Sequence, residues 1–155
     1  MTLITMRIIV TYTIKRLERD VVPSMQIKKF IYDVAVKVNE IFGNKYNWKN
    51  FPVQDYINRN YIAICFRGDE PVGLMAGSLS PTIFDKNVII LKQNLLYALP
   101  NTRASYHLLK DFIDFGKVHA NHIITTIHLK TNIKPSSLQK LGFEKLEENY
   151  RLEIS

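Results

Sequence analysis

The chain is poor in cysteine and has no long apolar run. Cys65 is the only cysteine of the 155 residues, so an internal disulfide is impossible. Its apolar neighbours Ile62, Ile64 and Phe66 predict a buried thiol, which is typical of a reducing compartment. No apolar run reaches the roughly 18 residues of a membrane span, and the N-terminal segment lacks the small-residue cleavage site of a signal peptide. We therefore expect a cytoplasmic protein without a membrane span.

The motifs of several enzyme classes are absent as well. The sequence contains no P-loop, no dinucleotide-binding glycine fingerprint and no nucleophile elbow. His119 and His122 are close in sequence, but they flank an expected helix end and have no evident third ligand, so no metal site is predicted. Internal repeats, low-complexity segments and linker-like changes of composition are missing too. We expect one domain over residues 1–155.

Positive charge is in excess. The sequence has 21 Lys and Arg residues against 14 Asp and Glu residues, which gives a net charge of +7. This excess favours anionic partners, such as nucleotides, polyphosphates or nucleic acid, but does not choose among them. The hydrophobic content of 46% and the charged content of 23% are ordinary for a globular protein.

Hydrophobic periodicity predicts both helices and strands. Apolar residues at helical spacing indicate a long helix capped by Asp20 or Ser24 and ended by Gly43. Further helices are expected after Pro52, from Ala104 onward, and over residues 135–141. Stretches rich in β-branched and aromatic residues predict strands, with a hairpin turn at residues 68–71 between two of them. The expected strands are residues 6–15, 61–67, 72–79, 88–98, 123–129, 143–147 and 149–154.

This order of elements is typical of a mixed α/β (α+β) fold. We expect a mostly antiparallel central sheet flanked by helices, with one parallel crossover between the 88–98 and 123–129 strands. Within it, the 88–98 strand runs into Pro100, a polar turn with Arg103 follows, and a helix pattern begins directly afterwards. The first amides of a helix bind phosphate well, so this unit is a candidate anion site.

The order of elements and two local motifs resemble the GCN5-related N-acetyltransferase (GNAT) superfamily. The first motif is the apolar strand segment from Leu96 that runs into Pro100 and Arg103. The second is Leu138-Gln139-Lys140-Leu141-Gly142-Phe143, which is similar to the late helix of the family and the Gly-Phe pair after it. The resemblance covers about residues 23–154. The chain's ending also resembles acetyltransferase-like proteins encoded by tailed bacteriophages.

The resemblance implies acetyl-coenzyme A as cosubstrate. The pantetheine arm would pair with main-chain groups of Leu96 and Ala98, on either side of Tyr97, like an added strand. The pyrophosphate would lie on backbone amides at the helix start. The family often uses an asparagine in the loop after the next strand to hold the cofactor, and Asn132 occupies that loop. The amides at the helix start are those of Arg103, Ala104, Ser105, Tyr106 and His107.

The chain departs from the family pattern at this turn, because the usual Arg-Gly-x-Gly-x-Gly loop has no glycine here. Ala104 and Ser105 are small, but Tyr106 places a large side chain where a glycine would stand. The tyrosine that often acts as general acid in the family is replaced by Leu138. The acidic residue of the central strand is also missing, since the polar residues there are Lys92, Gln93 and Asn94.

A standard acid and base pair is therefore not implied. Side-chain assistance would come from His128, near the end of the 123–129 strand, or from Tyr150. These residues also have ordinary structural interpretations, as a core histidine and a core or rim tyrosine. In the same way, Arg103 could be an exposed turn residue, Ser105 a helix cap and His107 a surface residue, and Asn132 could simply form a turn.

Two functions remain open at this point. The first is an N-acetyltransferase that moves acetyl from acetyl-coenzyme A to a primary amine of a small molecule or protein by direct attack. The alternative is a weak or inactive module of the same fold that binds nucleic acid or another anionic partner.

A set of aromatic residues with interleaved positive charge fits either a wall of the acceptor site, a surface for stacking on bases, or plain core. It comprises Trp48, Phe51, Tyr56 and Tyr61, with Lys45, Lys49 and Arg59. Either a monomer or a homodimer is compatible with the sequence.

Overall fold

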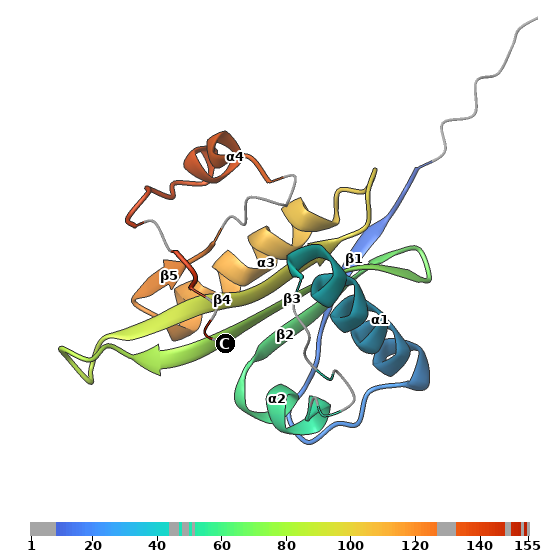
Figure 1. Ribbon diagram of the computed structural model, residues 1–155. Helices are drawn as coiled ribbons and strands as arrows, with labels where there is room; N and C mark the ends of the chain where they lie inside the picture. Colours follow the sequence, from blue (N-terminus) through green and yellow to red (C-terminus); the bar gives the residue numbers. More distant parts are fainter. Residues whose placement is uncertain are drawn as a thin grey trace, which may run out of the picture.

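A computed structural model of the protein (Figure 1) describes residues 9–43, 47, 50, 52–126, 133–147, 150–152 and 154. One five-stranded sheet in the order β1-β2-β3-β4-β5 forms the centre. The first three pairs of neighbours are antiparallel, and β4 and β5 are parallel. The expected mixed α/β fold is therefore confirmed. The strands are β1 Tyr12–Arg16, β2 Tyr61–Arg67, β3 Glu70–Pro81, β4 Ile89–Ala98 and β5 His122–Ile124, and the helices are α1 Met25–Phe42, α2 Val53–Arg59, α3 Ala104–His119 and α4 Pro135–Lys140.

Helix α1 begins and ends at residues that sequence reasoning proposed. The hydroxyl of Ser24 accepts a hydrogen bond from the amide of Ile27 at 3.3 Å, so Ser24 rather than Asp20 is the cap. Gly43 ends the helix in the left-handed conformation, at φ +65°. Between them, Ile31 and Val34 are buried on the face that meets the sheet. The apolar stripe and the two caps are local signals, which is why they could be read from the sequence.

The sheet separates two apolar cores. Helices α1 and α2 pack on one face, around residues such as Ile64 and Leu74. Helix α3 packs on the opposite face, around Phe112 and Leu108 (Figure 1). Successive β4 residues alternate between the two cores, with Leu95 on the α1 side and Leu96 on the α3 side.

Glycines bring α3 unusually close to the sheet. A Cβ atom placed on Gly73 of β3 would lie 2.8 Å from the Cβ of Ala104, the first residue of α3. One placed on Gly77 would lie 2.5 Å from the ring of Phe112. Because these positions lack side chains, the start of α3 is pressed directly onto the strand that neighbours β4.

Three details differ from the predictions. The β2–β3 turn is shorter than expected, since only Gly68 and Asp69 lie between the strands and Gly68 has a φ of +61°. Strand β5 comprises His122–Ile124 rather than residues 123–129, and Ile123 and Ile124 are half-buried rather than buried. Residues 127–129 of that expected strand lie outside the described part of the chain.

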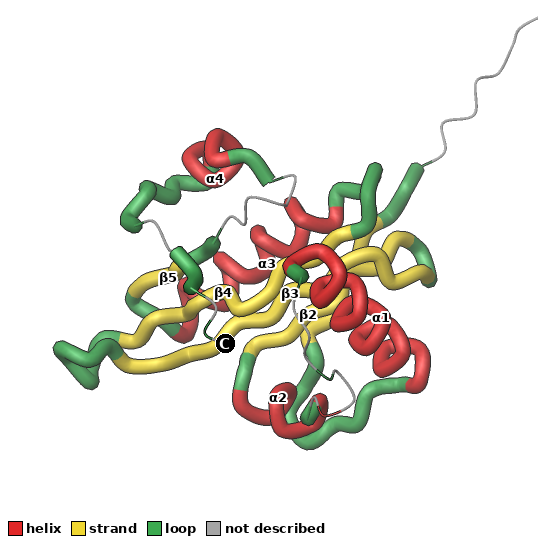
Figure 2. Tube along the Cα trace, in the orientation of Figure 1, coloured by secondary structure: helices red, strands yellow, loops and turns green. Residues whose placement is uncertain are grey.

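The closing strands expected at residues 143–147 and 149–154 are absent from the described residues of that region, which Figure 2 draws as loop. The sequence there does alternate, but its described apolar side chains are exposed, apart from Phe143, which packs partly buried against the core beneath α3. Leu146 is 73% exposed and Leu152 is 84% exposed. Without burial on a sheet face, nothing offsets the entropy lost on ordering a strand.

Candidate active site

Strands β4 and β5 part shortly after they meet. Their pairing covers only Ile90, Leu91 and Lys92 of β4, whereas β3 accompanies β4 as far as Ala98. Where the two strands separate, the side chain of Gln93, rather than main-chain groups of β4, bonds to the residues that follow β5. Its amide nitrogen donates to the carbonyl of Thr126 at 3.3 Å, and its oxygen accepts from the hydroxyl of Thr125. Within the described residues, β4 therefore has one open edge beyond this point.

The main-chain groups on this open edge belong to Leu96 and Ala98. The amide of Leu99 donates to the carbonyl of Val72 on β3 at 2.8 Å. Because main-chain groups alternate along a strand, those of Tyr97 point to β3 as well, while those of Leu96 and Ala98 point to the other edge. An extended ligand could therefore pair with β4 as β5 would have done.

The open edge leads into the turn before α3. Asn101 has a φ of +59°, and the hydroxyl of Thr102 donates to the carbonyl of Leu99 at 2.7 Å. The amide of Arg103 donates to the Tyr12 hydroxyl at 3.2 Å. Arg103 occupies the N-cap position without a side-chain cap, so Ser105 does not cap the helix.

Three amides at the start of α3 thus point out of the helix. The amide of His107 makes the first helical bond, to the carbonyl of Arg103 at 3.3 Å. The preceding amides, of Ala104, Ser105 and Tyr106, have no acceptor within the helix. Amides in this position form a ready site for an anion.

The surroundings of these amides are positive. Burial lowers the pKa of His107, and the charges of Arg103 and Lys110 lower that pKa further. The guanidinium of Arg103 lies 5.6 Å from the centre of the Tyr106 ring, and His107 stacks on Tyr12 with ring centres 4.9 Å apart. The Tyr106 side chain is 45% exposed, so it projects from the helix instead of filling the turn.

A contact between β3 and α3 positions the start of the helix. Ala104 is fully buried, with its methyl group against Gly73 of β3. Gly73 thus lets the first residue of α3 lie directly on the strand. Sequence reasoning missed this contact because Gly73 and Ala104 lie on different elements.

The remaining predicted site residues are His128, Asn132 and Tyr150. His128 and Asn132 lie outside the described residues. Tyr150 is 90% exposed in a loop. The roles predicted for these residues remain predictions.

A cavity of about 450 Å³ lies on the opposite face of the sheet, between α1, α2 and the strands. Its apolar wall includes Ile31, Ala35 and Val38 of α1 and Leu74, Ala76 and Leu95 of the sheet. Tyr56 and Asn94 form a polar end, where the Asn94 amide nitrogen donates to the Tyr56 hydroxyl at 2.6 Å. A second cavity, of about 340 Å³, includes Lys28 and Asp55 in its lining.

The predicted aromatic set is divided between two places. Tyr56 lines the 450 Å³ cavity, whereas Tyr61 is buried in the core beneath α3. Trp48 and Phe51 lie outside the described residues. Of the three interpretations, plain core holds for Tyr61, whose side chain lies on the α3 side of the sheet and so does not share a wall with Tyr56.

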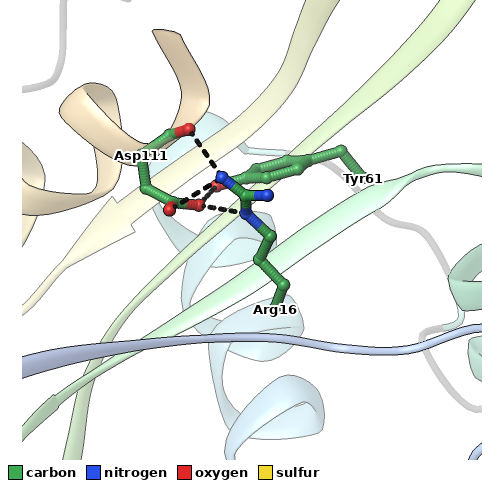
Figure 3. Close-up of polar contacts among 3 residues, drawn as sticks. All are labelled: Arg16, Tyr61 and Asp111. Atoms are coloured by element: carbon green, nitrogen blue, oxygen red, sulfur yellow. Dashed lines mark hydrogen bonds and ion pairs between the residues drawn. The ribbon is translucent and has the colours of Figure 1, made fainter. Parts of the chain in front are cut away.

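A polar network that no sequence pattern indicated joins β1, β2 and α3 (Figure 3). The carboxylate of Asp111 accepts two bonds from the Arg16 guanidinium, at 2.9 and 3.0 Å, and one from the Tyr61 hydroxyl at 2.7 Å. Burial and the bond to Asp111 raise the pKa of Tyr61, so Tyr61 stays protonated as a donor. The bond to Asp111 raises the pKa of Arg16. We assign the network to holding α3 on the sheet.

No group of three or more His, Cys, Asp or Glu side chains in the described part of the chain is placed to hold a metal ion. Among the described helices, none combines the length and apolar content that a membrane crossing requires.

Comparison with solved structures shows a known fold. A probable acetyltransferase superimposes with a TM-score of 0.71 at 15% identity, covering 92% of this chain and 98% of that one. A transcriptional regulator from Bacillus halodurans C-125 gives 0.69 at 15% identity, with coverage of 93% and 100%. An aminoglycoside N-acetyltransferase in complex with coenzyme A gives 0.63 at 12% identity, with coverage of 94% and 95%. Neither a protein-family model nor a curated protein sequence matches the chain. The fold is that of the GNAT acetyltransferases.

Proposed function

We propose that this chain, which has the acetyltransferase fold, transfers an acetyl group from acetyl-coenzyme A to a primary amine of a small molecule or protein. The observation that carries the proposal is the open edge of β4, which leads directly to the uncapped amides of α3. An extended ligand with a phosphate at one end matches this pair of features. The free thiol of the buried Cys65 also supports a cytoplasmic location.

The contacts of the cosubstrate follow from the directions of the main-chain groups. Leu96 and Ala98 would pair with the amides of the pantetheine arm. The pyrophosphate would accept bonds from the amides of Ala104, Ser105 and Tyr106, because the amide of Arg103 is bonded to Tyr12 and that of His107 is bonded within the helix. The Arg103 side chain would add a charge-assisted contact to the phosphates.

The reaction is a direct acyl transfer. The neutral amine nitrogen attacks the thioester carbonyl carbon, a C–N bond forms, the C–S bond breaks, and coenzyme A leaves as a thiolate. The proton lost by the amine passes to water, a main-chain carbonyl can accept a hydrogen bond from the amine, and His128 and Tyr150 are the side chains proposed to assist. The protein contributes mainly by holding the amine close to the thioester.

The proposal is tested by isothermal titration with acetyl-coenzyme A. We expect Arg103→Ala to weaken binding about tenfold, since a charge-assisted bond contributes roughly 1.5–3 kcal/mol. Arg19→Ala is the control, because Arg19 is an exposed arginine in the loop between β1 and α1 and should not change the affinity. Absence of binding at millimolar cosubstrate would overturn the proposal.

Direct attack also predicts that the single cysteine is dispensable. Cys65 is fully buried in β2, and burial raises the pKa of its thiol to about 11. A thiol of this kind is a poor nucleophile at neutral pH. We therefore expect Cys65→Ala to keep the turnover rate of the unsubstituted protein within about twofold once the folded fraction is corrected for the loss of packing.

The measurement is the initial rate of coenzyme A release with a responsive amine acceptor. Mass spectrometry of the native protein mixed with acetyl-coenzyme A provides a second readout, and we expect no acetylated protein. An acetyl group on Cys65, or loss of turnover in a folded Cys65→Ala protein, would show that a covalent enzyme intermediate operates instead.

The alternative function, binding of nucleic acid or another anionic partner, is favoured by the net charge of +7 and by the similarity to a solved transcriptional regulator. Affinity for nucleic acid that depends on phosphate contacts falls steeply with salt. Tight binding of a duplex or single strand that weakens across a salt series, together with no binding of acetyl-coenzyme A, would favour this function over acetyl transfer.

A further inference from the structure

The lining of the 450 Å³ cavity between α1, α2 and the sheet indicates the chemical class of the amine acceptor. Its volume is within the range of small-molecule sites, which are mostly apolar with a few polar groups. Its polar end contains Asn94, which lies next to Gln93, the residue at which β4 and β5 part. The cavity thus approaches the open edge of β4 from the face opposite to α3.

A bulge in β4 directs Asn94 toward this cavity. Gln93 pairs with Gly77 and Leu95 pairs with Ala76, so Asn94 between them has no residue opposite it in the register with β3. A residue in a bulge is turned away from the regular alternation of the strand. The Asn94 amide accordingly contacts Tyr56 of α2, at 2.6 Å, and accepts a hydrogen bond from the Ser78 hydroxyl at 3.4 Å.

The described lining of the cavity is uncharged. Its polar members are four asparagines and Tyr56, and the remaining members are apolar. Burial raises the pKa of Tyr56, so this hydroxyl is neutral at physiological pH.

This lining argues against a polycationic acceptor. A polyamine or an aminoglycoside carries several ammonium groups, and each one that leaves water without a carboxylate partner costs several kcal/mol. The net charge of +7 adds a general repulsion for such molecules. An acceptor that carries negative charge is disfavoured as well, because the described lining has no Lys, Arg or His to pair with it.

We infer that the acceptor is a primary amine carried on an apolar, otherwise uncharged body, which enters this cavity with its amine end at Asn94 and Tyr56. The inference rests on the proposed acetyltransferase function, because only then does the amine need to reach the open edge of β4. The apolar wall takes up the body, and the Asn94 oxygen is the acceptor for an N–H group of the amine.

The test compares two amines by isothermal titration, 2-phenylethylamine as the apolar monoamine and spermidine as the polycation. Each is titrated into the full chain with and without coenzyme A. We expect 2-phenylethylamine to bind at least about tenfold more tightly than spermidine, which corresponds to roughly 1.4 kcal/mol. Equal or tighter binding of spermidine overturns the inference, and so does the absence of binding by both amines at millimolar concentration.

Variants locate the bound amine. Ala35→Phe places a ring inside the cavity and should weaken 2-phenylethylamine binding at least about tenfold. Asp33→Phe adds the same ring to an exposed position of α1, outside the cavity lining, and should leave binding unchanged. If Ala35→Phe does not fold by circular dichroism, Ala35→Leu replaces it. Unchanged binding in a folded Ala35 variant overturns the inference.

The outcome separates the inference from the proposed function. Binding of acetyl-coenzyme A together with faster acetylation of spermidine would reject only the apolar acceptor. If 2-phenylethylamine binds in the cavity but acetyl-coenzyme A does not bind the protein, the acetyltransferase function is rejected. The cavity then remains a site for an amine on an apolar body.

Discussion

Gly73→Ala is expected to weaken acetyl-coenzyme A binding at least about tenfold, although the substituted residue would not touch the cosubstrate. The added Cβ would lie 2.8 Å from the Cβ of Ala104 and 2.9 Å from a methyl group of Leu108. The Ala104 methyl cannot rotate away, so the start of α3 must move off the sheet by up to about 1 Å to restore normal contact. A displacement of this size in a positioning element can cost about 100-fold in function.

A variant of the neighbouring glycine separates this effect from general destabilisation. Gly77→Ala would bring a Cβ within 2.5 Å of the Phe112 ring, in the middle of α3 rather than at its start. Both substitutions overpack the same core and should cost about 1–3 kcal/mol of stability. Only Gly73→Ala should also impair acetyl-coenzyme A binding, as measured by titration at a temperature at which both proteins are folded.

A second substitution, which removes the Ala104 methyl group, should restore binding of acetyl-coenzyme A. In the double variant Gly73→Ala, Ala104→Gly, the helix loses the nearer of the two side-chain atoms that the new Cβ would meet, and of these two only the flexible end of Leu108 stays close. We expect much of the affinity for acetyl-coenzyme A to return. Equal affinities of Gly73→Ala and the unsubstituted protein would show that the position of the α3 start does not control binding.

Asp111→Ala is expected to cause the largest loss of thermal stability among polar substitutions in the described part of the chain. The change leaves the Tyr61 hydroxyl, on a residue that is 3% exposed, without its acceptor, and it removes both carboxylate bonds of Arg16. An orphaned buried donor and lost charge-assisted bonds together cost about 3 kcal/mol, which lowers Tm by roughly 6–12 °C for a domain of this size. Differential scanning calorimetry measures the shift.

Asp114 supplies the matched control for this prediction. It lies on the same helix but is exposed, and Asp114→Ala should change stability by less than about 0.5 kcal/mol. A double-mutant cycle with Tyr61→Phe then isolates the hydrogen bond between Tyr61 and Asp111. Comparable Tm values for Asp111→Ala and Asp114→Ala would mean that the network in Figure 3 does not hold α3 on the sheet.

The elements that were predicted correctly depend on local signals. The stripe of Ile27, Ile31 and Val34, with Ser24 before it and Gly43 after it, defines α1 without reference to any other part of the chain. The parallel pairing of β4 and β5 followed from the helix between them. The strand expected at residues 143–147 was a wrong prediction. Alternation predicts which side chains share a face, but not which strand or core that face packs against.

The sequence by itself determined the order of helices and strands, the layered α/β fold and the position of the turn at Arg103, because periodicity and capping act over neighbouring residues. Only the tertiary structure decided what that turn can bind. It placed Gly73 under Ala104, left the Leu96 and Ala98 side of β4 open within the part of the chain that the structure describes, and turned Asn94 toward a cavity whose described lining is uncharged. These features depend on contacts between residues far apart in the chain, which packing brings together and no local pattern encodes.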